Sequence, residues 1–85
     1  MKDIPPYMTA DGDPVKVYGT NKIGLERHGI PADTQKALLK AYKLVYRSNL
    51  LTEAALERIE AELPHSPELD HFVEFIRTSQ RGIAR

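Results

Sequence analysis

Four cations recur along one predicted helix at spacings that place them on a single face. Lys36, Lys40, Lys43 and Arg47 are separated by four, three and four residues, which is the period of one side of an α-helix. Such a stripe attracts an acidic protein surface, chiefly by speeding association, and added salt weakens the attraction. The polar face of an ordinary amphipathic helix carries the same kind of charge run and meets only water. A docking stripe and a solvated face are both consistent with these residues.

A second group of polar side chains lies in the segment before that helix. Arg27 and His28 fall at the end of a short predicted helix, where the helix dipole favours a cation. A cationic side chain at this position could also bind an anionic ligand. Asn21 stands at the start of the same helix, as a cap for backbone amides or as a contact for a ligand. His65 and His71 are expected on the surface, in a proline-bounded loop and on the outward side of the last helix.

Motifs for catalysis and for metal or cofactor binding are missing from the sequence. The three histidines lack the spacing of metal ligands, and the chain has no cysteine, so no metal site is predicted. No glycine-rich phosphate loop, His-Glu-x-x-His motif or nucleophile elbow occurs. We therefore predict no catalytic residue and no cofactor in this chain.

Size and charge limit the function further. The 85 residues indicate one small domain with a single core. Twelve basic and twelve acidic side chains give a net charge of zero, which argues against general nucleic-acid binding. There is no signal peptide and no apolar run near the roughly 18 residues of a membrane span. The lack of cysteine fits a reducing compartment, so we expect a cytoplasmic protein that does not span a membrane.

The first 18 residues are predicted to be extended rather than helical. Pro5 and Pro6 impose extended geometry on the chain before them. Residues 7–10 and 15–18 are short candidate strands, separated by the turn signal Asp11-Gly12-Asp13-Pro14. An isolated hairpin is marginal in water. This segment is therefore expected to lie against the helices or to be the end of a larger β structure.

Four helices are predicted in the remainder of the chain, 19–85. A short helix is capped by Thr20 or Asn21 and ends at Gly29, and the longest helix follows from 31 to about 48. The third runs from a cap at Thr52 to Leu63, and the fourth spans about 67–80. Their apolar faces consist of Leu38, Ala41, Tyr42 and Val45, then Ala55, Leu56, Ile59 and Leu63, then Leu69, Phe72, Val73 and Ile76, with Phe75 at the edge. Short connections make sequential helices antiparallel, so the predicted fold class is all-α, a small up-down bundle after a short β segment.

Further boundary signals refine these helices. Pro31 is expected at the first position of the long helix, and Asn49 is expected to end that helix in the left-handed conformation. Ser66 followed by Pro67 predicts a capped start for the last helix.

Three groups of residues in register resemble one protein family. They are Pro-Pro-Tyr at 5–7 followed by Gly-Asp-Pro at 12–14, Gly-Leu-x-Arg at 24–27, and Ala-Tyr-Lys-Leu-x-Tyr-Arg-Ser at 41–48. The match runs from about Ile4 to Arg85, through the terminal Arg-Gly-Ile-Ala-Arg. The chain resembles the C-terminal part of the acyl-[acyl carrier protein]–UDP-N-acetylglucosamine O-acyltransferases, which begin lipid A synthesis.

This resemblance implies a homotrimeric enzyme whose subunits begin with a left-handed β-helix of hexapeptide repeats. The enzyme transfers a (3-hydroxy)acyl chain from acyl carrier protein to the 3-hydroxyl of UDP-N-acetylglucosamine, so these two are the implied partners. Residues 1–18 would be the last coil of the β-helix, and 19–85 the helical domain. The family's catalytic base is a histidine in the β-helix, and none of the histidines in this chain occupies that position.

The resemblance also assigns roles to residues. Asn21 and Arg27 match positions near the nucleotide sugar, and the stripe from Lys36 to Arg47 would receive the acidic carrier protein. His28, which is also expected to bind substrate, stands where relatives often have a second arginine. Glu26 stands where a basic residue is common, and both differences soften the local positive field. Two functions follow. The chain is either the substrate- and carrier-binding domain of the acyltransferase, not catalytic alone, or a free-standing helical module that binds carrier protein without catalysis.

Overall fold

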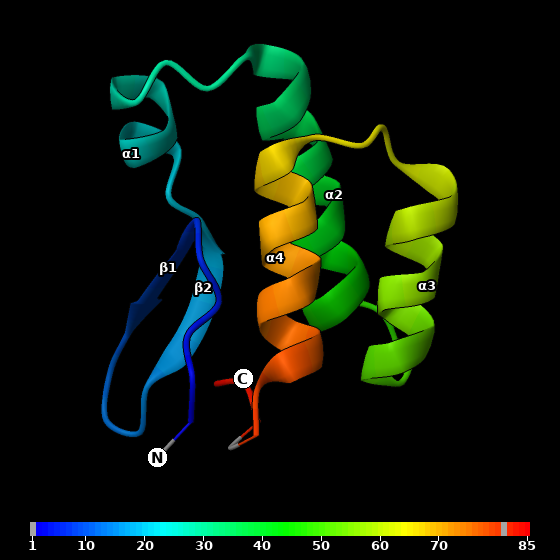
Figure 1. Cartoon of the computed structure of the whole chain (residues 1–85). Helices are drawn as coiled ribbons and strands as arrows, with labels where there is room; N and C mark the ends of the chain where they lie inside the picture. The colour runs from blue at the N-terminus through cyan, green and yellow to red at the C-terminus, as the bar shows by residue number, and fades with distance from the viewer. Residues whose placement is uncertain (1, 81) are drawn as a thin grey trace.

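The computed structural model describes residues 2–80 and 82–85, which form a β-hairpin and four helices (Figure 1). The helices are α1 (Lys22–Arg27), α2 (Ala32–Tyr46), α3 (Thr52–Glu62) and α4 (Pro67–Thr78). The last three pack on one another, while α1 lies beyond one end of the hairpin, to the side of these three (Figure 1). The predicted all-α bundle with a short β segment before it is confirmed. Residues 1 and 81, which the predicted segments 1–18 and 19–85 include, lie outside the described residues.

The hairpin consists of β1 (Met8–Asp11) and β2 (Lys16–Thr20), which pair antiparallel. The turn between them contains Gly12, whose φ of +96° is a conformation that glycine adopts without steric cost. Each strand begins one residue later than predicted, and β2 continues past the predicted boundary at residue 18. Pairing across the ladder, rather than local sequence, decides where these strands end.

Three predicted helix boundaries are confirmed. At the start of α1, Asn21 Oδ1 accepts a hydrogen bond from the Gly24 amide (3.1 Å). Just after its end, Gly29 has a φ of +68°. At the start of α4, Ser66 Oγ accepts a hydrogen bond from the Leu69 amide (3.1 Å). The two side-chain caps satisfy amides that a helix start leaves unpaired.

Two boundaries of α2 differ from the prediction. Pro31 occupies the N-cap, one position before the first helical residue. Asn49 does not adopt the predicted left-handed conformation. Ser48 takes over the role at this end, because its Oγ donates to the Leu44 carbonyl (2.5 Å) and accepts from the Leu50 amide (3.2 Å). A hydroxyl that satisfies both groups removes the need for a left-handed residue there.

The predicted cap of α3 is also wrong. Thr52 is the first residue of the helix, and Leu51 occupies the N-cap without a side-chain hydrogen bond. Thr52 Oγ1 instead accepts a hydrogen bond from Arg85 Nη2 (2.6 Å). The Thr52 hydroxyl, which the local sequence predicts to cap the helix, is therefore hydrogen-bonded to a residue distant in the sequence.

The core lies between the three packed helices and the inner side of the hairpin. The predicted apolar faces are confirmed, and Phe72, Leu38 and Leu56 are fully buried. The core comprises Met8, Val17, Leu25, Leu38, Ala41, Tyr42, Val45, Ala55, Leu56, Ile59, Leu69, Phe72, Val73, Ile76 and Ala84. Leu63 and Phe75 are half-buried at its margins.

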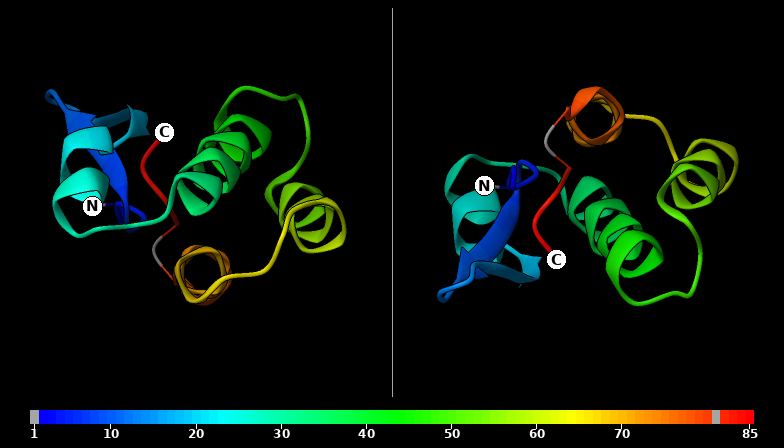
Figure 2. Two further views of the ribbon diagram at one scale, coloured as in Figure 1. Left: turned by 90° about the horizontal axis from the view of Figure 1, so that it is seen from above. Right: turned by 90° about the horizontal axis from the view of Figure 1, so that it is seen from below.

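The C-terminal residues 82–85 run between the hairpin and the helices α2 and α4 (Figure 2). Ile83 forms a parallel bridge with Asp3, and the Tyr46 hydroxyl donates to the Ala84 carbonyl (2.8 Å). The two ends of the chain thus lie side by side and join the hairpin to the bundle.

Candidate functional site

The Asn21 side chain is held in place by the first turn of α1. Its Oδ1 caps the Gly24 amide, and a Cβ added to Gly24 would lie 2.8 Å from Asn21 Nδ2. A contact that short is not tolerated, so glycine at position 24 permits this position of the Asn21 amide. The cap uses only the carbonyl side of the amide. The two hydrogen atoms on Asn21 Nδ2 are therefore available to donate to a ligand.

A cavity of about 340 Å³ adjoins this cap. Its described lining residues are Tyr7, Asn21, Gly24, Leu25, His28, Ile30 and Glu68. The structure therefore brings together two of the three predicted substrate-binding residues, Asn21 and His28. Arg27 is exposed in the last turn of α1 and does not line this cavity. An amide, an imidazole and a carboxylate side by side suit a neutral polar group with both donors and acceptors better than they suit a phosphate.

Tyr7 lines this cavity, although the sequence predicted no role in binding for it. Its φ of +69° is rare for a residue with a bulky side chain. Its carbonyl oxygen accepts a hydrogen bond from the backbone N–H of Asn21 (2.8 Å). The Tyr7 hydroxyl lies 3.1 Å from His71 Nδ1, and the two rings meet edge to face. Burial, and then the Glu68 carboxylate, raises the pKa of Tyr7. His71, predicted to be only a surface residue, is exposed but joins α4 to the chain before β1.

The four cations of the α2 stripe are exposed, and the structure divides them between two hollows. Lys40, Lys43 and Arg47 border a groove of about 470 Å³ between α2 and the end of α3, which Leu44, Ser48, Glu62 and Leu63 complete. Lys36 lines a separate hollow of about 390 Å³ near α1. The stripe thus gathers three charges around one groove, and the fourth lies apart.

The groove combines an apolar floor with a charged rim. Leu44 and Leu63 are half-buried and pack against the core. The carboxylate at the rim, Glu62, is held by Arg58 at 2.7 Å, which lowers the pKa of Glu62 chiefly through their hydrogen bond. Its charge is therefore partly offset, and the rim stays positive along α2. Neither Glu62 nor Leu63 was predicted here, because only the packing of α3 on α2 brings them beside the lysines.

Arg47 differs from the lysines of the stripe. Its Nε donates to the Tyr42 hydroxyl (3.2 Å), and its guanidinium carbon lies 5.9 Å from the centre of the Tyr42 ring. The charge is therefore fixed at the end of α2, whereas the lysines carry no such contact in the described structure. The sequence offers one signal for this pairing, a tyrosine five residues before an arginine near a helix end.

The described parts of the chain contain neither a cluster of possible metal ligands nor a membrane-spanning helix. Among residues 2–80 and 82–85, no three histidine, aspartate or glutamate side chains gather as a metal site would require. In the same residues, no helix has the length and apolar character needed to cross a membrane.

Comparison with protein families gives one clear match. A family model described as Udp N-acetylglucosamine O-acyltransferase, domain 2, covers residues 3–84. The acyl-[acyl-carrier-protein]–UDP-N-acetylglucosamine O-acyltransferase of Thermodesulfovibrio yellowstonii is 42% identical over 84 residues, 99% of this chain and 33% of that protein. The protein of the same name from Aquifex aeolicus is 47% identical over 83 residues, 98% of this chain and 32% of that protein. The chain spans about a third of the length of these relatives.

Solved structures give the same match. A UDP-N-acetylglucosamine acyltransferase from Bacteroides fragilis superposes with a TM-score of 0.96 at 46% identity, over 100% of this chain and 33% of that one. LpxA from Acinetobacter baumannii superposes with a TM-score of 0.94 at 36% identity, over the same shares. Sequence and fold therefore agree along almost the whole chain, which belongs to the UDP N-acetylglucosamine O-acyltransferase family as its domain 2.

Proposed function

We propose that this chain is the substrate- and carrier-protein-binding domain of an acyl-[acyl carrier protein]–UDP-N-acetylglucosamine O-acyltransferase. That enzyme transfers a (3-hydroxy)acyl chain to the sugar 3-hydroxyl in the first step of lipid A synthesis, in the cytoplasm. One observation carries the proposal. In a domain of this family, Lys40, Lys43 and Arg47 border an apolar groove on α2.

The groove suits an acidic helical surface such as that of acyl carrier protein. Its floor offers Leu44 and Leu63 to apolar side chains, and its rim offers three cations to carboxylates. Opposite charges across such an interface raise the association rate and set the orientation of the partner. Lys36 extends the same positive face along α2 and adds long-range attraction rather than a contact in the groove.

The nucleotide sugar is assigned to the neighbourhood of α1. Asn21 and His28 line a cavity there with Tyr7 and Glu68, which offers donors and acceptors to a base or a sugar. Arg27 is exposed nearby on the last turn of α1 and does not line the cavity that contains the Glu68 carboxylate. We assign the diphosphate to Arg27, because a guanidinium group binds phosphate oxygens through paired hydrogen bonds.

The proposal includes two limits on what the chain does alone. The catalytic histidine is assigned to the β-helix of the family, and residues 1–18 are proposed to be the last coil of that β-helix. The full enzyme is proposed to be a homotrimer with its reaction centre between subunits. A purified sample of this chain should therefore bind its partners and transfer no acyl group to UDP-N-acetylglucosamine above a blank.

The second candidate is a free-standing module that binds acyl carrier protein without catalysis. The same groove supports it, since docking there needs no catalytic residue. The DNA upstream separates the two candidates. An in-frame run of hexapeptide repeats favours the acyltransferase, and its absence favours the module.

Calorimetric titration of the chain with acyl carrier protein tests the binding role shared by both candidates. The wild-type chain should bind, and the Lys40→Glu, Lys43→Glu double variant should bind at least roughly tenfold more weakly, because two attractions become repulsions. The two residues are exposed, so the variant should melt as the wild type does. Equal binding by both proteins would refute the carrier role of α2.

A further inference from the structure

A small cavity between β2 and the end of α2 gathers three cations and three tyrosines. It measures about 220 Å³ and is lined by Lys16, Val17, Tyr18, Tyr42, Tyr46, Arg47 and Arg85. Each of these described residues has a cationic, aromatic or apolar side chain, and no aspartate or glutamate is among them. The whole chain has a net charge of zero, so this concentration of positive charge is local.

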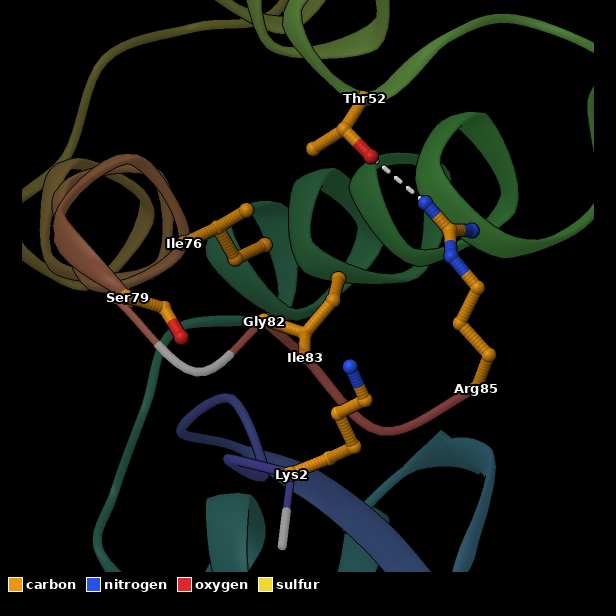
Figure 3. A pocket seen from close by; sticks show the side chains of 7 residues that line it. All are labelled: Lys2, Thr52, Ile76, Ser79, Gly82, Ile83 and Arg85. Atoms are coloured by element: carbon orange, nitrogen blue, oxygen red, sulfur yellow. Dashed lines mark hydrogen bonds between the residues drawn. The ribbon is translucent and has the colours of Figure 1, made fainter.

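The two arginines here are bonded to neutral partners. Arg47 Nε donates to the Tyr42 hydroxyl. Arg85 donates to the Val45 carbonyl (3.0 Å) and to the Thr52 hydroxyl (2.6 Å), the second of which is drawn in Figure 3. These bonds fix the guanidinium groups, and among the described residues neither group forms an ion pair with an aspartate or glutamate side chain.

Other arginines of the same chain provide an internal comparison. Arg58 pairs with Glu62, and Arg77 pairs with Glu53 and Glu60 at 2.9 and 3.0 Å. The hydrogen bond from Arg77 lowers the pKa of Glu60, as expected for a carboxylate beside a cation. Arginines on the outer faces of α3 and α4 therefore pair with glutamate side chains, whereas the two at this cavity have no such partner in the part of the chain that the structure describes.

The tyrosines hold the charged groups in position. Tyr42 and Tyr46 stack with ring centres 5.3 Å apart, and each ring faces one guanidinium, at 5.9 Å for Arg47 and 5.8 Å for Arg85. The Tyr42 hydroxyl donates to the Tyr18 carbonyl (3.0 Å), which ties the stack to β2. The stacked and hydrogen-bonded tyrosines keep the two guanidinium groups at a fixed separation. Binding a ligand there therefore requires little rearrangement of these side chains.

We propose that this cavity is an oxyanion site and that its ligand is a phosphate ester. Three like charges around one small space repel one another, and a bound anion relieves that repulsion. A phosphate monoester carries about two negative charges and offsets most of the three. Guanidinium groups recognise phosphate through paired hydrogen bonds. Tyr18 lines the cavity and is 58% exposed, and its ring offers a flat apolar surface to the organic part of the ester.

Titration of the ¹⁵N-labelled chain with inorganic phosphate and with phenyl phosphate, at moderate salt and pH 7.5, tests the site. Amide resonances of residues 16–18 and of the end of α2 should shift together and saturate. Lys16→Gln and Arg47→Gln should each weaken binding roughly tenfold, because each removes a charge-assisted contact. Lys36→Gln removes the same charge from another part of α2 and should leave the affinity unchanged.

Phenyl phosphate should bind more tightly than inorganic phosphate, since its ring contacts Tyr18. Shifts that do not saturate, that centre on α1, or that respond equally to Lys16→Gln and Lys36→Gln would overturn the site. Equal affinity for the two probes would overturn its assignment to an ester. Arg47 borders both this cavity and the carrier groove, but Lys40 and Lys43 line only the groove and Lys16 lines only the cavity, so variants at these three lysines test the two sites separately.

Discussion

Truncation of the Phe72 side chain is the sharpest test of the fold that positions these surfaces. Phe72 lies on α4 with none of its surface exposed, inside the cluster that joins the three packed helices. Phe72→Ala removes the ring from a site that neighbouring side chains can fill only partly. Changes of this kind cost about 3–5 kcal/mol of unfolding free energy.

That loss is large for a domain of this size. A chain of 85 residues has a total unfolding free energy of about 4–13 kcal/mol, so the variant should lose roughly a quarter of its stability or more. The melting temperature should fall by at least about 12 °C, since each kcal/mol is worth about 4–8 °C in a small domain. Circular dichroism at a helix-sensitive wavelength follows the transition.

Phe75→Ala is the matched control. It deletes the same ring from the same helix at a half-buried position, so it should cost clearly less. Phe72→Leu retains part of the volume and supplies a folded variant in case the alanine protein does not fold. A Phe72→Ala protein that melts within about 2 °C of wild type, or no more readily than Phe75→Ala, would contradict the assigned core.

Three further predictions concern individual side chains. Gly24→Ala should displace the Asn21 side chain, because the added Cβ would lie 2.8 Å from its amide nitrogen; an unchanged Asn21 side-chain resonance would contradict this. Arg27→Ala should weaken UDP-N-acetylglucosamine binding roughly tenfold by calorimetry while costing only about 0.3–1 kcal/mol of stability. Burial raises the pKa of Tyr46 to about 12, so its contribution to stability is complete below pH ~10 and is lost as the pH rises through 12. Tyr46→Phe should therefore lose less stability between pH 8 and 11 in urea unfolding; identical losses would refute this assignment.

The helical part of the fold follows closely from the sequence. The period of the apolar residues predicts the buried faces of α2, α3 and α4. The caps at Ser66 and Asn21 are also predicted correctly, because each side chain bonds to an amide only three residues away. Predictions fail where a distant residue decides the outcome. Thr52 does not cap α3 because its hydroxyl accepts from Arg85, and nothing in the local sequence of residues 49–55 indicates that contact.

The candidate sites depend still more on tertiary structure. The spacing of the basic residues predicts the stripe on α2, but not that Leu63 completes a groove beside it, because α3 must pack first. The positive φ of Tyr7 has no signal beyond the preceding proline pair. The fixed position of Arg47 on Tyr42 likewise appears only when the side chains are placed.

The rate of association with acyl carrier protein tests the central claim most directly. Stopped-flow measurements at several salt concentrations compare the wild-type chain with the Lys40→Glu, Lys43→Glu variant. The Lys2→Glu, Lys22→Glu variant is the control, because it carries the same net charge on surfaces away from the groove. The wild type and the control should associate fast at low salt and slow steeply as salt rises, whereas the groove variant should associate slowly with little salt dependence. Equal rates and equal salt slopes for all three proteins would contradict docking on α2.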